Sequence, residues 1–383
     1  MSQTNFNPWL HRFVVLTALA TLALLGVGGL VTSHGVGMAV PDWPTTYGYN
    51  MFFFPISKWT GGIFYEHSHR LVASGVGLLT TLLAVWLWLK ESRAWLRWLS
   101  VIAFFAMVLQ GALGKLRVML FKDEIGIFHA TLAQMFFALI CAMALFTSRW
   151  WAERRTPIRR GAGTQAGSRS ADSEIGAPMR RLFLAATILI FLQLILGATM
   201  RHQHAGLAIP DFPLAYGKLW PAMDADSTSS YNARRIETTA ANPITALQVG
   251  LQMAHRLMAL AILICVGAVA WSAGLRPGEF SSTTIAPGRG PAPLLRRLAF
   301  GWLGLILFQA GLGAWTIWSN KAADVATAHV LVGALSLVTG ALGCIIAFRR
   351  STGPVEATAL ASAPFGDARD DAFAGNPAAV LNQ

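Results

Sequence analysis

Long apolar runs, separated by shorter polar segments, dominate the chain. Each run is about 20 residues long, which is enough for an α-helix to cross the hydrocarbon core of a bilayer. There are eight such runs, at residues 12–32, 68–89, 97–118, 126–148, 181–200, 248–272, 295–317 and 325–348. The pattern therefore predicts an all-α integral membrane protein with eight transmembrane helices.

Lysine and arginine residues predict how these helices are oriented. They gather in alternate connections and after the last run, in segments 90–97, 149–181, 276–297 and 349–350. Because short cytoplasmic loops carry an excess of basic residues, these segments and both termini are expected in the cytoplasm. The two long connections, 33–66 and 201–247, are then outside. We expect a multi-pass protein of the cell (inner) membrane, in contact with lipid.

The two halves of the chain repeat each other. Gly37 to Pro44 (GMAVPDWP) is matched by Gly206 to Pro213 (GLAIPDFP), and His69-Arg70-Leu71 by His255-Arg256-Leu257. With four helices in each half, both halves start on the same side, so the repeats are parallel. The sequence predicts two pseudo-symmetric four-helix bundles, at 1–150 and 181–350. A flexible cytoplasmic linker at 151–180 and a disordered tail at 351–383 complete the expected organisation.

Composition and charge exclude other classes of protein. Hydrophobic residues make up 54% of the 383 residues and charged residues 13%, against about 25% charged in soluble domains. The net charge of +12 lies in the loops, where it indicates orientation, so no nucleic-acid partner is expected. The three cysteines, Cys141, Cys265 and Cys344, all lie in apolar runs and build no disulfide framework.

Four histidines lie near the ends of separate apolar runs, namely His69, His129, His255 and His329. In each half they fall on the second and fourth helices, at similar depth. Two imidazoles that face each other across a bundle make a bis-histidine heme site. Arg70 and Arg256, each next to a predicted ligand, are placed to bind heme propionates. The alternative is that each histidine satisfies a nearby hydroxyl or carbonyl. The repeat favours heme ligation.

The other histidines, and a repeated glutamine pattern, have simpler interpretations. His11, His34, His67, His202 and His204 lie at helix ends or in loops without repeat partners, so we expect structural roles. Gln110 and Gln309 each precede a glycine by four residues, and so does Gln193. This spacing is typical of close helix packing.

One difference between the halves is relevant to chemistry. Glu66 precedes His69 by three residues, whereas Gln252 precedes His255 by three. Residues three apart share a helix face, so only the first half has a carboxylate within reach of its heme. The asymmetry predicts one reactive site and one that holds a cofactor or passes electrons.

With these motifs in place, the sequence resembles the heme A synthase family from about residue 12 to 348. The resemblance implies an oxidoreductase that converts a ring methyl group of heme O to the formyl group of heme A, for the cofactor of terminal oxidases. It implies substrate heme O between His69 and His129, permanent heme b between His255 and His329, and Glu66 as the essential carboxylate. Many bacterial relatives have a cysteine pair in the first outer loop, and segment 33–66 has none.

The resemblance also implies an electron donor, which the sequence does not name, and contact with a heme O synthase or oxidase assembly factors. The sequence does not determine whether the protein forms a homo-oligomer. One alternative function is a di-heme b-type electron carrier or quinol oxidoreductase, which would need no carboxylate beside only one heme. Another is a transporter whose histidines relay protons. The Pro-rich outer segments 41–44 and 210–213 are expected to form lids over the heme edges, or to anchor at the membrane interface.

Overall fold

The structure is a computed structural model, and it describes residues 6–153, 169–234, 243–274 and 291–349. Within these residues, eight helices are long and apolar enough to cross a membrane. They are α1 (Pro8–Ser33), α2 (Gly61–Lys90), α3 (Ala94–Leu120), α4 (Asp123–Thr147), α6 (Arg169–His202), α8 (Ala246–Gly274), α9 (Pro291–Trp318) and α10 (Ala323–Phe348). Each contains or closely matches a predicted run. The prediction of an all-α, multi-pass membrane protein is confirmed.

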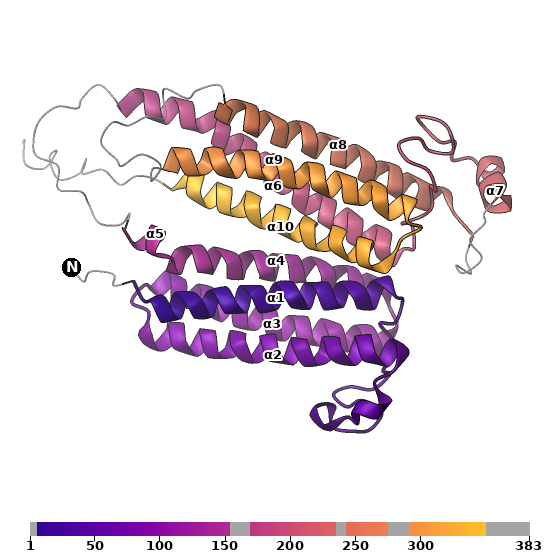
Figure 1. Cartoon of the computed structure of the whole chain (residues 1–383), viewed down its shortest axis with the longest axis horizontal. Coiled ribbons are helices and arrows are strands. Elements are labelled where there is room, and N and C mark those ends of the chain that lie inside the picture. The colour runs from indigo at the N-terminus through magenta and orange to yellow at the C-terminus, as the bar shows by residue number, and fades with distance from the viewer. Residues whose placement is uncertain (1–5, 154–168, 235–242, 275–290, 350–383) are drawn as a thin grey trace, which may run out of the picture.

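The long helices form two bundles that lie side by side (Figure 1). Helices α1 to α4 make the first, around a core that includes Val14, Leu87 and Ile140. Helices α6, α8, α9 and α10 make the second. Its core includes Phe183 and Trp302, whose rings stack with centroids 5.4 Å apart. Each bundle therefore has its own apolar core, as the repeat predicts.

The two bundles meet along α1, α4, α6 and α10. Phe137 of α4 and Val338 of α10 belong to one buried apolar cluster at this contact. A polar contact lies nearby, where Arg201 of α6 donates to the Gly29 carbonyl and to the Ser33 hydroxyl, both at 2.5 Å. The Ser33 end of α1 is therefore fixed to the second bundle as well as to its own.

Two parts of the chain differ from the sequence prediction. Helix α6 begins at Arg169, inside the expected linker 151–180, because a helix can continue beyond its apolar, membrane-spanning part. The short helices α5 (Arg149–Glu153) and α7 (Ala225–Ala233) were not expected. Asp224 caps α7 by accepting from the Ser227 N–H at 2.8 Å. The expected tail at 351–383 lies outside the described residues.

The repeated segments 37–48 and 206–217 fold alike. In the first, the Asp42 carboxylate accepts from the N–H groups of Tyr47 and Gly48, both at 2.8 Å. The Tyr47 hydroxyl donates to the Ala39 carbonyl at 2.5 Å. The matching contacts in the second half are made by Asp211, Tyr216, Gly217 and Ala208. Each half therefore presents the same tight loop beside the helix that carries its first predicted ligand.

Candidate functional site

The second bundle brings its two predicted ligands face to face. The rings of His255 on α8 and His329 on α10 have centroids 6.4 Å apart and planes tilted by 57°. A metal bound to both rings needs two metal–nitrogen bonds of about 2 Å each, which with the rings gives about 6 Å between centroids. The Nδ1 atom of each ring is buried without a hydrogen-bond partner. The pair therefore fits an iron between two imidazoles.

The first bundle carries its two predicted ligands on the corresponding helices, His69 on α2 and His129 on α4. The Nδ1 atom of each of these rings is again buried and unpartnered. Buried polar atoms are nearly always hydrogen-bonded, so four such atoms at repeat-related positions indicate a role in binding. Neutral imidazole is a common ligand of iron.

A heme fits these pairs better than a bare metal ion does. Among the described residues, no group of three or more His, Cys, Asp or Glu side chains could hold a metal ion. Each bundle core instead offers two imidazoles, which is the axial ligand set of a heme. The donor set therefore suits a heme, and the assignment of these four histidines as its ligands stays a prediction.

A glycine of the neighbouring helix lies against each of the four imidazoles. A Cβ atom added to Gly28 on α1 would lie 3.0 Å from the Cε1 atom of His69. The corresponding distances are 3.6 Å for Gly114 and His129, 3.3 Å for Gly197 and His255, and 3.2 Å for Gly313 and His329. These glycines let the backbone approach the ring closely. An added Cβ atom would crowd the imidazole at Gly28, Gly197 and Gly313, whereas at Gly114 it would make an ordinary van der Waals contact.

Glutamines supply a second contact that the sequence interpretation missed. Gln110 Nε2 donates to the His129 carbonyl at 3.0 Å. Gln193 and Gln309 donate to the carbonyls of His255 and His329, both at 2.9 Å. Each glutamine stands one helical turn before the glycine that faces the same histidine. From the sequence, the Gln-x-x-x-Gly pattern predicts only close helix packing. Its occurrence in three helices is the signal in the sequence for these glutamine–carbonyl contacts.

Glu66 and Gln252 occupy equivalent positions and make equivalent contacts with the loops at 37–48 and 206–217. Glu66 is 4% exposed, and its Oε2 atom accepts from the Val40 N–H at 2.8 Å. Gln252 is 2% exposed, and its Oε1 atom accepts from the Ile209 N–H at 2.6 Å. The difference lies in charge, because only Glu66 forms an ion pair, with Arg70 at 2.8 Å.

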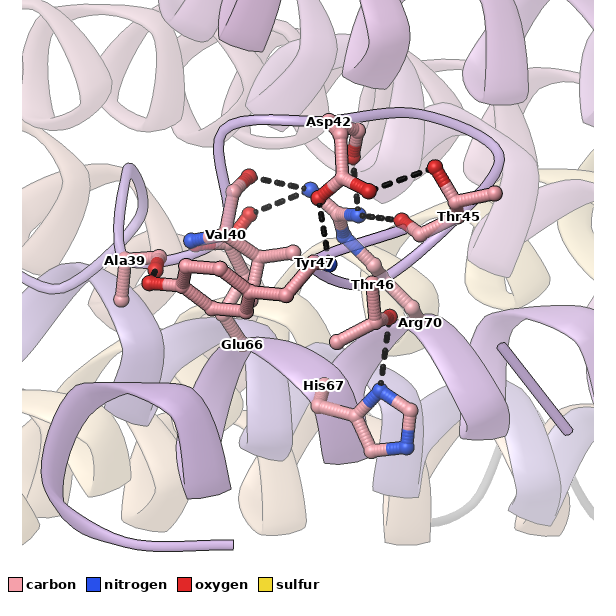
Figure 2. A network of polar contacts seen from close by, with 9 residues as sticks. All are labelled: Ala39, Val40, Asp42, Thr45, Thr46, Tyr47, Glu66, His67 and Arg70. Carbon is pink, nitrogen blue, oxygen red and sulfur yellow. Dashed lines mark hydrogen bonds and ion pairs between the residues drawn. The ribbon is translucent and has the colours of Figure 1, made fainter. Parts of the chain in front are cut away.

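Arg70 and Arg256 hold the loops through backbone carbonyls. Arg70 donates to the carbonyls of Val40, Asp42 and Thr45 at 2.6–3.1 Å, and Figure 2 shows the loop wrapped around its guanidinium group. Arg256 makes the matching contacts with the carbonyls of Asp211 and Leu214, at 2.7 and 2.8 Å. The structure thus gives both arginines a loop-binding role. Propionate binding by them stays a prediction.

His67 takes part in the same loop contacts. Its ring is fully buried, and its Nδ1 atom lies 3.1 Å from the Thr46 hydroxyl. Phe54 and Trp59 pack against it with centroid distances of 5.0 and 4.8 Å. These contacts agree with the structural role expected for His67.

Removal of the Asp42 carboxylate should loosen the first loop. We expect Asp42→Ala to speed protease cleavage within 37–48, because the N–H groups of Tyr47 and Gly48 lose their acceptor. Limited proteolysis of the purified protein measures this. Asp211→Ala is the matched control, and it should expose only the second loop. Equal cleavage of the first loop in wild type and Asp42→Ala would contradict the assignment.

The same loop should open at low pH. Burial raises the pKa of the Asp42 carboxyl, but hydrogen bonds from Gly48, Thr45 and Tyr47 outweigh it and hold that pKa below its ordinary value of 3.8. A lowered folded-state pKa contributes stability above the ordinary pKa that is lost as the pH falls through the folded value. Protease sensitivity of 37–48 should therefore rise below pH 3.8, measured with an acid protease.

Comparisons with known proteins show which family and which proteins this chain resembles. The model of the family COX15-CtaA, described as cytochrome oxidase assembly protein, matches residues 11–341. A protein of Geobacillus kaustophilus (strain HTA426) named heme A synthase is 27% identical over 366 residues, covering 91% of this chain and 94% of that protein. Heme A synthases of Lysinibacillus sphaericus (27% over 271 residues, 70% and 76%) and Shouchella clausii (29% over 214 residues, 55% and 65%) are also similar.

Proposed function

We propose a function from one premise, which is that the chain belongs to the COX15-CtaA family of cytochrome oxidase assembly proteins. The family match confirms the resemblance inferred from the histidines and the repeat. From the similar proteins named heme A synthase, this chain is an enzyme of heme A biosynthesis. We propose that it acts as a heme A synthase, an oxidoreductase that converts a ring methyl group of heme O to a formyl group.

The observation that carries this proposal is the pair of histidine sites with a carboxylate beside only one. The first bundle would bind heme O as substrate through His69 and His129. The second would hold heme b through His255 and His329, whose 6.4 Å centroid separation fits a shared iron. Heme b, when bound, supplies an iron that accepts and donates one electron. An electron carrier with two equivalent hemes would not need this asymmetry.

Glu66 is the residue proposed to move protons. Two hydroxylations of the methyl group, followed by loss of water from the diol, would give the formyl group. A hydroxylation in which O2 supplies the oxygen consumes two electrons from a donor and two protons and releases water, so a group that takes up and releases protons must lie near the ring. Glu66 is on the same helix face as His69 and has a carboxylate held by the Val40 N–H and by Arg70. The corresponding Gln252 has no titratable proton. This contrast supports a reactive first bundle and a cofactor-holding second bundle.

The location and the partners of the enzyme are part of the proposal. We place it in the cell (inner) membrane with both termini in the cytoplasm, on the basis of the basic loops. An electron donor must serve it. A heme O synthase would supply the substrate, and oxidase assembly factors would receive the product.

Analysis of the bound hemes tests the proposal. The protein should be purified from cells that also make heme O, and its hemes extracted and separated by chromatography. We expect heme B together with heme O or its oxidised derivatives. Two equivalents of heme B and no heme O would favour the electron carrier, and a protein without heme would favour the transporter.

A further inference from the structure

The glutamine contact is present at three of the four predicted heme ligands and missing at His69. The residue that corresponds to Gln193, four positions before the facing glycine, is Leu24 in the first bundle. Leucine has no hydrogen-bond donor. Gly28 nevertheless lies against the His69 ring just as Gly197 lies against the ring of His255. At His69, the first bundle therefore keeps the glycine that lies against the ring and lacks the glutamine that binds the backbone carbonyl.

The glutamine and the glycine of this pattern constrain different parts of a histidine. Residues four apart lie on the same face of a helix, one turn from each other. The glutamine of this pair binds the backbone of the ligand, and the glycine meets its ring. Gln309 also reaches the ring, with its Nε2 atom 3.5 Å from the Nε2 atom of His329. A ligand held at both points has a fixed height along the bundle and a fixed ring position. Outer contacts of this kind orient ligands and affect how tightly the metal is held.

Among the residues that the structure describes, the polar side chains next to His69 do not replace the missing contact. The side chains of Glu66 and Arg70 are directed to residues 40–45 of the outer loop. Helix α1 itself is fixed, because Arg201 binds Gly29 and Ser33 on it. Glu66 and Arg70 hold the adjacent turn of α2 to its loop as Gln252 and Arg256 hold α8. The difference between the bundles is therefore the one constraint on His69 that Leu24 cannot supply.

We propose that Gln110, Gln193 and Gln309 are positioning residues that hold their histidines on iron, and that His69 is the ligand that detaches when heme enters or leaves. This inference rests on the proposed function, in which the first bundle exchanges substrate for product and the second retains its heme. A site that exchanges its heme needs one axial ligand that dissociates readily from the iron. The sequence difference between Gln193 and Leu24 places that ligand at His69.

The first test uses Gln193→Leu, which gives the second bundle the arrangement of the first. Transfer of heme b from the purified protein to excess apomyoglobin is followed by absorbance. We expect transfer about fivefold faster than in wild type, because one hydrogen bond that holds the ligand is lost. The low-spin ferric EPR signal should also shift, since it depends on the angle between the imidazole planes, which is 57° here. An unchanged rate and EPR signal would overturn the proposal.

The second test uses Leu24→Gln, with Leu24→Met as a control of similar size that lacks a donor. Heme loaded into the first bundle should transfer to apomyoglobin about fivefold more slowly from Leu24→Gln than from Leu24→Met. Equal rates in these two variants would refute the role of His69. Absence of heme A from the wild-type protein would refute the proposed function instead, and the heme b measurements on Gln193→Leu do not depend on it.

Discussion

Replacement of Glu66 by glutamine is expected to lower heme A formation by about a hundredfold or more, the range for loss of a general acid or base. The protein should still fold, because Gln252 shows how an amide does the same structural work. Gln252 accepts from the Ile209 N–H and donates to the Ile209 carbonyl. In the variant, residue 66 can contact Val40 in this way. The loss should therefore be one of proton transfer, with the loop in place.

Heme content and heme A yield measure this outcome in one preparation. Glu66→Gln should keep heme b and still bind heme O. The matched control, Gln252→Glu, changes the equivalent position of the other bundle and should leave most of the heme A formation intact. Heme A formation at the wild-type rate in Glu66→Gln would remove Glu66 from the chemistry, and the electron-carrier function would then be favoured.

Replacement of His255 or His329 by alanine should remove the low-spin heme b from the protein. With the two rings 6.4 Å apart across the bundle, either substitution leaves the iron one axial ligand. We expect the purified variants to contain little heme b, or heme b in a high-spin state, and to make little heme A. Optical spectra and the heme-to-protein ratio report this directly. The first bundle should still bind heme O, because its ligands are unchanged.

A buried histidine outside the predicted pairs provides the control. His202 on α6 is 5% exposed and packs against Gly126 of α4, so loss of its imidazole also removes a buried ring from a membrane helix. His202→Ala should retain low-spin heme b. Full low-spin heme b in both His255→Ala and His329→Ala would show that other residues are its ligands.

The helices and the repeat could be predicted from sequence because each rests on a local pattern. Apolar length predicts a span, and the matched His-Arg-Leu triplets indicate the repeat without any structure. The loop contacts could not be predicted in this way. An arginine next to a heme ligand resembles a propionate-binding residue, and only the fold shows that Arg70 donates to carbonyls 25 to 30 residues earlier in the chain. Such pairings depend on loop conformation.

The glutamine contacts illustrate a different limit. The pattern Gln-x-x-x-Gly is visible in the sequence, but its partner is a backbone carbonyl on another helix. A backbone carbonyl leaves no trace in residue identity, so packing was the simpler interpretation. The absence of the pattern before Gly28 became meaningful only when the structure placed Gly28 against His69.

The equivalent anchoring by Glu66 and Gln252 has an evolutionary consequence. Codons for glutamate and glutamine differ by a single nucleotide, and both side chains bind the N–H of the matching loop residue, Val40 or Ile209. Exchange between them alters the proton chemistry of a bundle while its loop stays attached. Under the proposed function, one base change at this position interconverts the carboxylate of the reactive bundle and the amide of the cofactor-holding bundle while the contact with the loop is kept.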